Sequence, residues 1–237
     1  FSRNQLKFWI KEKYSKNNFY WNSNFCAKRL INLIYTFDFY AVSLKESEKT
    51  LFKQIILQHF LINSLYLYYK NSNDLSIENS KADLLMRLIY GESIDKTIIF
   101  IKKQIFKNID INGFHKSYNP VYQAEYINNL IEIKNILLYF KRRLISELDY
   151  QIINMTSVLN NLFHKDSSLA LFNGSHNMFQ KNIFDILKQN DDLKIKKLYK
   201  IKNGLAIYSD NDKKIFIEIL KPTNENINKN LHSGTLG

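Results

Sequence analysis

The chain has 237 residues, of which 45% are hydrophobic and 24% are charged, a mix typical of globular proteins with a sizeable core. Only two prolines and six glycines occur, which favours long helices over a many-stranded β fold, and no apolar run reaches the roughly 18 residues that a membrane helix needs. The net charge of +12 suggests an anionic partner, either nucleic acid or an acidic polysaccharide, although a composition rich in Lys, Asn, Ile, Tyr and Phe gives the same excess without any binding purpose.

Apolar residues recur at helical spacing along most of the chain, beginning with Leu6, Trp9 and Ile10 on one face. Gly91 suits the position that ends a helix, and Pro120 suits the first turn of one. Together these features predict helices over residues 24–35, 46–69, 78–90, 94–107, 121–138, 148–163 and 178–189. Because short loops join them, we expect antiparallel pairs in an α/α array.

The pattern changes after Asp192 to short, alternating, β-branched segments. We predict strands over residues 197–202, 204–209 and 214–220. The sequence therefore predicts a helical domain over residues 1–192 and the beginning of a β domain over residues 193–237.

We expect the chain to be a fragment, because it begins with Phe1 rather than Met and Leu231–Gly237 resembles the entry to a strand. The one cysteine, Cys26, is expected to be a small buried apolar side chain.

Four stretches resemble bacterial proteins of the heparinase II/III-like family, notably its alphaproteobacterial branch. Trp21–Ile31 is similar to an early family helix, and Asn112–Pro120 to a loop that reads Gly-Gly-His-x-Ser-x-Asn-Pro. Leu169–Gly174 matches a Leu-Ala-Leu-Phe-Asn-Gly segment, and His232–Leu236 resembles a His-Ala-Gly-x-Leu strand. The four occur in the family's order over nearly the whole chain.

The resemblance implies a mainly α fold, an incomplete (α/α) toroid of antiparallel helix pairs, followed by the first strands of a C-terminal β-sandwich. It implies a polysaccharide lyase that performs β-elimination on an acidic polysaccharide containing uronic acid, of the heparin, heparan or alginate kind, in a cleft shared by the two parts. It implies no nucleic-acid partner. It also implies a bacterial protein and leaves both periplasm and cytoplasm open.

Elimination requires donors that neutralise the substrate carboxylate, a base for the adjacent proton, and an acid for the leaving oxygen. The resemblance makes Tyr122 the catalytic tyrosine, with Tyr118 as the local rival. His115 could donate to the carboxylate or act as the base, and Asn119 could donate its amide to the substrate. The alternative is that His115 only caps the loop and that Asn119 only starts a helix.

Three further asparagines and a histidine are candidates for substrate binding. Asn79 matches a family asparagine that binds the substrate carboxylate, although an ordinary helix cap explains it equally well. Asn173 and His176 could contact sugar hydroxyls at the rim of the cleft, or could belong to a turn and the following helix cap. Asn230 stands where the family lyases carry a catalytic histidine.

The resemblance makes His232 a ligand of a structural zinc in the full-length protein. Two places later the family has an acidic residue where this chain has Gly234. Because of Asn230 and Gly234, a catalytically inactive relative that binds acidic glycans is an alternative function. A basic helical nucleic-acid-binding protein, with aromatic side chains interleaved among lysines, is a remoter one.

Overall fold

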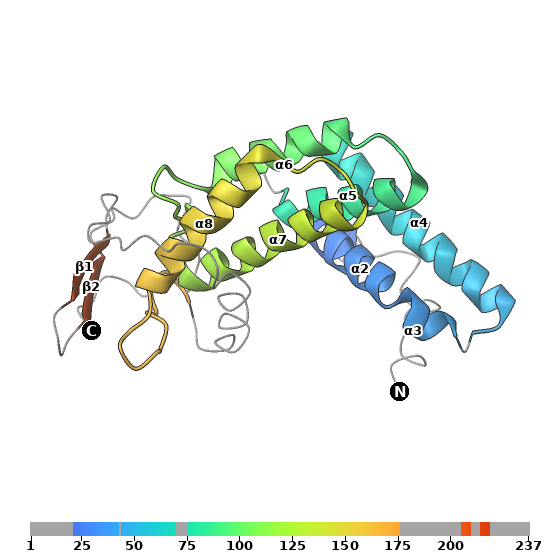
Figure 1. The fold of residues 1–237 in the computed structure, drawn as a ribbon. Coiled ribbons are helices and arrows are strands. Elements are labelled where there is room, and N and C mark those ends of the chain that lie inside the picture. Colours follow the sequence, from blue (N-terminus) through green and yellow to red (C-terminus); the bar gives the residue numbers. More distant parts are fainter. Residues whose placement is uncertain (1–20, 43, 70–74, 176–204, 210–213, 219–237) are drawn as a thin grey trace. The chain divides into compact units, whose positions relative to one another are not determined.

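The computed structural model describes residues 21–42, 44–69, 75–175, 205–209 and 214–218. This part of the chain is mainly helical, as predicted, and contains one antiparallel hairpin (Figure 1). The helices are α2 (Ser23–Tyr35), α3 (Phe37–Ala41), α4 (Glu46–Tyr69), α5 (Ile77–Tyr90), α6 (Asp95–Asn108), α7 (Pro120–Tyr139) and α8 (Ser146–Asn161), and the strands are β1 (Leu205–Ser209) and β2 (Lys214–Glu218). None of these helices is long and apolar enough to span a membrane.

Six predicted helices and two predicted strands are confirmed, and each of their ends differs from the prediction by two residues or fewer. Gly91 ends α5 in the left-handed conformation, with φ 69°, as expected of a glycine at that position. The short helix α3 was not predicted, because Phe37 continues the apolar spacing of α2. The segments predicted at 178–189 and 197–202 lie outside the described residues.

The chain divides into two units, which we call the first unit (Phe1–Ile101) and the second unit (Lys102–Gly237). This division differs from the predicted domain boundary between residues 192 and 193. That boundary lies outside the described residues, so it stays a prediction.

The core of the first unit lies where α2 packs against α4 and α5. Its buried apolar side chains recur at spacings of three and four residues, so each helix turns one face inward. They are Ala27, Leu30, Ile31 and Leu33 of α2, Phe52, Ile55, Ile56 and Phe60 of α4, and Ala82 and Met86 of α5.

Two titratable side chains are buried beside this core. His59 is 0% exposed, and its Nδ1 donates to the Ile55 carbonyl at 2.8 Å. Cys26 is also 0% exposed, and its thiol donates to the His59 carbonyl at 3.4 Å. Burial raises the pKa of Cys26 to about 11. The thiol therefore stays protonated, and the prediction that Cys26 behaves as a small buried side chain is confirmed.

A buried carboxylate links α4, α5 and α6 within the first unit. Asp83 is 0% exposed and accepts hydrogen bonds from the hydroxyls of Ser64, Tyr68 and Thr97. Arg87, one turn later on α5, donates to the same carboxylate through Nε at 2.9 Å. The cost of burying this charge is offset because hydrogen-bond donors and a positive charge surround it.

In the second unit, α7 and α8 pack against each other (Figure 1). Each helix buries one apolar face, with Leu130, Ile133 and Leu137 on α7 and Leu148 and Ile152 on α8. The strands β1 and β2 pair in antiparallel register from Leu205 opposite Glu218 to Ser209 opposite Lys214. Both belong to the predicted β segment.

The loop before α7 approaches α8 closely at Gly113. This glycine has φ 87°, and a Cβ placed on it would lie 3.0 Å from the backbone carbonyl carbon of Asn154. A side chain at this position would therefore meet both backbone strain and a backbone clash.

We predict that the stability of the first unit falls as His59 titrates. Burial, together with the charge of Arg29, lowers the pKa of His59 from 6.5 to about 4. The unfolded chain then binds more protons in this window. This contribution to stability is therefore fully present above pH 6.5 and is lost as the pH falls towards 4, by about 3 kcal/mol in all. Urea unfolding of the protein and of His59→Gln at several pH values measures it, and an equal pH slope in both proteins would refute the assignment.

We also predict that Gly113→Ala lowers the free energy of unfolding by about 2–4 kcal/mol, because the new Cβ meets the Asn154 backbone and the positive φ is strained. Gly91→Ala is the matched control, since its φ is 69° but nothing lies within 4 Å of the added Cβ. It should cost about 1 kcal/mol. Urea denaturation followed by circular dichroism gives both values, and equal losses would show that the close approach to α8 does not matter.

Candidate functional site

The loop that precedes α7 is held in one conformation by its own backbone. Ile109 and His115 form an antiparallel bridge that closes it. Inside the loop, the Asp110 carboxylate accepts hydrogen bonds from the backbone N–H groups of Asn112 at 2.8 Å and Phe114 at 2.9 Å. This carboxylate turn explains why the segment predicted as a loop is ordered, and it fixes the backbone at His115.

Gln123, on the buried face of α7, ties the loop to both helices. Its Oε1 accepts from the backbone N–H of His115 at 2.6 Å. Its Nε2 donates to the carbonyls of Gly113 at 2.9 Å and Met155 at 3.0 Å. Gln123 is 1% exposed, so these bonds replace water inside the unit. Sequence reasoning missed Gln123, although a glutamine on an apolar helix face is the pattern that could have found it.

The imidazole of His115 has a defined tautomer. The backbone N–H of Ser117 donates to Nδ1 at 3.2 Å, and the Ser117 hydroxyl lies 2.7 Å from the same nitrogen. A backbone N–H can only donate, so Nδ1 carries a lone pair and the proton of the neutral ring resides on Nε2. In this tautomer, Nε2 of His115 is a hydrogen-bond donor and cannot act as a base.

Asn119 begins α7, as the sequence suggested. Its Oδ1 accepts from the backbone N–H groups of Val121 at 2.8 Å and Tyr122 at 3.0 Å. One proton of its amide is committed to the Asn173 carbonyl at 2.8 Å. Pro120 takes the first helical position, where a missing N–H costs nothing. Asn119 therefore caps the helix and also holds a segment 54 residues away.

Asn173 also donates a hydrogen bond back to the loop that precedes α7. Its Nδ2 donates to the Tyr118 carbonyl at 3.2 Å. Asn173 and Tyr118 both have φ 52°, a conformation that side chains rarely adopt. The Tyr118 hydroxyl also donates to Asp110 Oδ2 at 3.2 Å. Two of the four stretches that carry the family resemblance are thus joined by reciprocal hydrogen bonds, and strained residues of this kind gather at functional sites.

Tyr122 stands in the first turn of α7 with 48% of its surface exposed. Its ring lies edge-on to the ring of His115, with 6.4 Å between centroids. The buried Tyr126, one turn later, lies 5.2 Å from the same imidazole. The structure therefore brings together Tyr122, His115, Asn119 and Asn173 of the predicted site, all within the second unit.

Asn79 lies in the first unit and is 0% exposed. Its Oδ1 accepts from the backbone N–H of Ser76 at 3.0 Å, which caps the start of α5. Its Nδ2 donates to the Ser23 carbonyl at 3.0 Å and to Asn63 Oδ1 at 2.9 Å. Both donors and the acceptor are thus used inside the protein. These contacts favour the helix-cap interpretation of Asn79 over substrate binding.

The remaining predicted residues, His176, Asn230 and His232, lie outside the described part of the chain. The zinc site that the resemblance implies also lies outside it, because its one expected ligand in this sequence is His232. Among the described residues, no group of three or more His, Cys, Asp or Glu side chains is placed to hold a metal ion. Comparison with protein-family models, with curated proteins and with solved structures finds no match to this chain.

We predict that Asn79→Ala destabilises the first unit by about 2–4 kcal/mol, because it removes the cap of α5 and leaves a buried carbonyl and a buried amide without their partner. Asn32→Ala, at an exposed position of α2, should change stability by less than about 0.5 kcal/mol. Thermal and urea unfolding measure both. An unchanged midpoint for Asn79→Ala would return Asn79 to the list of substrate-binding candidates.

Proposed function

We propose that this protein binds an acidic polysaccharide at the loop and first turn of residues 113–122 and cleaves it by β-elimination next to a uronic acid. The observation that carries this proposal is the pairing of an exposed Tyr122 with a tautomerically fixed His115 at the start of α7. The resemblance of this loop to that of the heparinase II/III-like family supports it. The same resemblance supports our proposal that the helices belong to an incomplete (α/α) toroid and the hairpin to a β-sandwich.

Charge neutralisation of the substrate carboxylate is the first task of such a site. The Nε2–H of His115 is a donor in the neutral ring. Asn119 and Asn173 each commit one amide proton to a backbone carbonyl, and each amide carries a second. The N-terminus of α7 adds a partial positive charge, which favours a carboxylate there. Stabilising the carboxylate also stabilises the enolate that forms when the neighbouring proton leaves.

Proton transfer is the second task, and we assign it to Tyr122. A tyrosine hydroxyl can act as a base where positive charge favours the phenolate, and the N-terminus of α7 provides a partial positive charge beside Tyr122. After removing the proton, the same hydroxyl can protonate the leaving glycosidic oxygen. The electron pair of the broken C–H bond forms the new double bond, and the pair of the broken C–O bond leaves with the oxygen. The reaction therefore balances without water or an oxidant.

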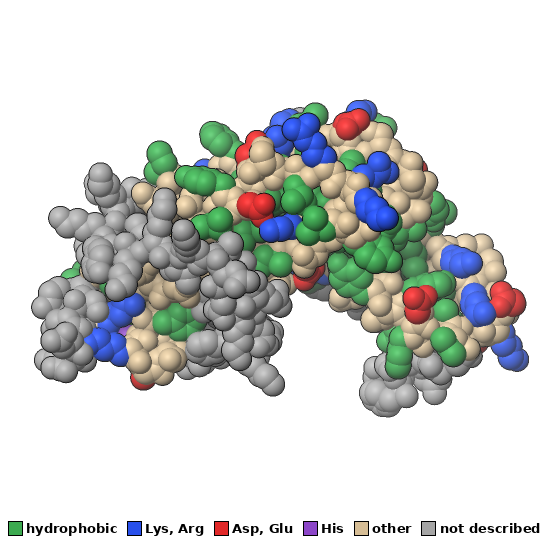
Figure 2. Space-filling view, viewed as in Figure 1, with side chains coloured by type: hydrophobic (Ala, Val, Ile, Leu, Met, Phe, Trp, Pro, Cys, Tyr) green, Lys and Arg blue, Asp and Glu red, His purple; other side chains and the backbone are tan. Residues whose placement is uncertain are grey.

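A catalytically inactive protein that binds acidic glycans is the second candidate. The observation that favours it is the sequence itself, which has Asn230 and Gly234 where the family lyases carry a histidine and an acidic residue. A nucleic-acid partner is less favoured. On the face drawn in Figure 2, the described Lys and Arg side chains are scattered, with Asp and Glu side chains among them, rather than gathered in one stripe.

We predict that Tyr122→Phe in the full-length protein lowers lyase activity by about 10²–10⁴-fold, because the ring remains but the proton-transferring hydroxyl is lost. The ultraviolet absorbance of the unsaturated product measures activity on heparin, heparan sulfate and alginate. Tyr139→Phe is the matched control, since Tyr139 lies on the same helix and is 81% exposed. It should retain full activity.

Two outcomes would contradict the proposal. Activity of Tyr122→Phe equal to that of Tyr139→Phe would remove Tyr122 from the chemistry. No product from any of the three polymers, together with measurable binding to one of them, would identify the glycan-binding alternative instead. Binding to nucleic acid with a steep dependence on salt would favour the third function.

A further inference from the structure

Three consecutive cations lie in the turn between α7 and α8. Lys141, Arg142 and Arg143 are all exposed, and together with residues 138–140 they form what we call the basic turn. Because α7 and α8 pack against each other, the basic turn is the tip of a helical hairpin. The sequence thus concentrates positive charge at one end of this hairpin.

The two carboxylates nearest to these cations in the sequence are engaged elsewhere. Glu147 forms a salt bridge with Lys102 at 3.0 Å, and Asp149 forms one with Lys134 at 2.6 Å. None of the salt bridges between described residues includes a cation of the basic turn. The first turn of α8 therefore balances other lysines and leaves its own neighbours in the sequence exposed to an external anion.

Lys141 occupies a position that suits glycine better. Its φ is 51°, its backbone N–H donates to the Leu138 carbonyl at 2.9 Å, and the Arg142 N–H donates to the Leu137 carbonyl at 2.8 Å. The same pattern ends α5, where the residue with positive φ is Gly91. The dipole of α7 favours a cation near its C-terminus, but a lysine is strained in the left-handed conformation. A charged residue thus stands where stability favours glycine, and strained residues gather at functional sites.

Apolar side chains are exposed beside the cations. Tyr139 is 81% exposed and Leu138 is 49% exposed, and the Tyr139 ring lies edge-on to that of Phe140, with 5.1 Å between centroids. A half-exposed leucine gains free energy only from an apolar environment, which neither a sugar polymer nor a phosphodiester backbone provides. Cations together with amphipathic aromatic side chains are the combination that binds the interface of an anionic bilayer.

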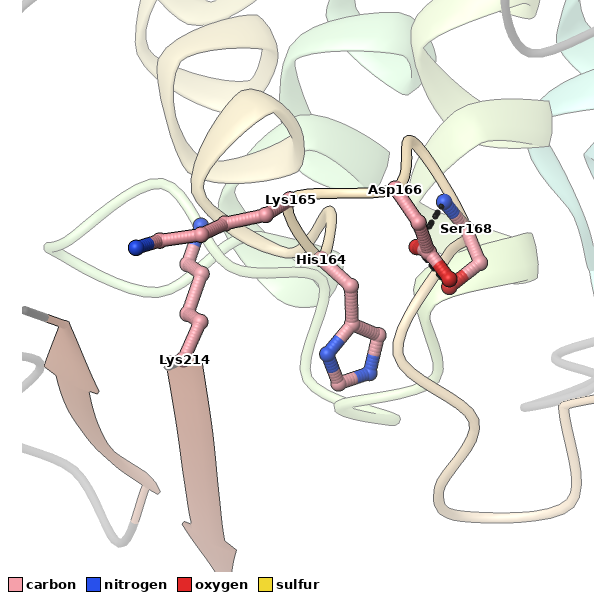
Figure 3. Close-up of a pocket in the computed structure, with 5 residues that line it drawn as sticks. All are labelled: His164, Lys165, Asp166, Ser168 and Lys214. Carbon is pink, nitrogen blue, oxygen red and sulfur yellow. Dashed lines mark hydrogen bonds between the residues drawn. The ribbon is translucent and has the colours of Figure 1, made fainter. Parts of the chain in front are cut away.

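A lysine pair elsewhere in the second unit has different surroundings. Lys165 and Lys214 line an open pocket that also contains Asp166 (Figure 3). Lys214 Nζ donates to the Phe163 carbonyl at 2.7 Å, and partial burial lowers the pKa of Lys214. That pocket mixes charges of both signs and holds one lysine against the protein, whereas the basic turn carries one sign and is exposed. The basic turn is therefore better suited to a flat anionic surface.

We propose that the basic turn binds the surface of a bilayer that contains anionic phospholipids. The three cations contact lipid phosphates, and Tyr139 and Leu138 lie at the boundary with the acyl chains. The proposal does not depend on the function proposed above, and it concerns contact with one face of the bilayer. Each lysine or arginine near an anionic membrane surface strengthens binding about fivefold, so the three together contribute about 100-fold.

The test is sedimentation of the full-length protein with vesicles made of equal parts phosphatidylcholine and phosphatidylglycerol. The first variant combines Lys141→Gln, Arg142→Gln and Arg143→Gln. Its affinity for these vesicles should fall about 100-fold. The matched control combines three exposed lysines of the first unit, Lys45→Gln, Lys53→Gln and Lys96→Gln. It removes the same net charge and should keep the affinity within about twofold, because the attraction falls off within a Debye length of the surface.

Lys141→Gly separates binding from stability. It should raise the midpoint of urea unfolding, because glycine adopts a positive φ without strain, and should weaken vesicle binding about fivefold, because one charge is lost. Damage to the fold would lower the midpoint and the binding together. Unchanged binding with a raised midpoint would remove Lys141 from the contact with the bilayer.

Three outcomes would overturn the proposal. The first is equal affinity of the triple variant and the control for the anionic vesicles. The second is equal binding of the unaltered protein to vesicles of phosphatidylcholine alone, since the cations would then have no role. The third is binding of nucleic acid or heparin that depends on residues 141–143, without binding to vesicles, which would assign the basic turn to a soluble polyanion.

Discussion

The side-chain amide of Gln123 makes three hydrogen bonds that fix the loop of residues 113–119 against α7 and α8. Gly113 lies so close to α8 that an added Cβ would clash with the helix backbone. At the same place, the Gln123 amide donates a hydrogen bond to the Gly113 carbonyl. The position of His115 follows, because its backbone N–H is the third partner. If the amide were lost, the half-buried N–H of His115 and the buried carbonyls of Gly113 and Met155 would each lose a hydrogen bond.

Buried amides organise the first unit in the same way. Asn79 joins the start of α5 to Asn63 on α4 and to the Ser23 carbonyl at the start of α2. Amide side chains suit these places because one group both donates and accepts, so it can satisfy a helix end and a neighbouring carbonyl together. A neutral amide also avoids the free-energy cost of removing a charge from water. The buried carboxylate of Asp83 carries that cost, which hydrogen bonds from four donors offset.

The helices could be predicted from the sequence because their causes are local. Apolar residues three and four apart recur within each helix, and Gly91 and Asn119–Pro120 mark the end of one and the start of another. The candidate site could be predicted only in part. Asn119 as a helix cap depends on its immediate neighbours, whereas its bond to Asn173 joins residues 54 apart, a pairing no local pattern contains. The tautomer of His115 likewise depends on loop geometry around Ser117.

The segment of residues 163–173 is held at both ends by contacts within the second unit. Ser167 has φ 66° and Asn173 has φ 52°. The Phe163–Leu169 bridge encloses the first of them, and the hydrogen bond to the Tyr118 carbonyl holds the second. The two positive φ angles persist because the surrounding hydrogen bonds hold the backbone in place against their strain.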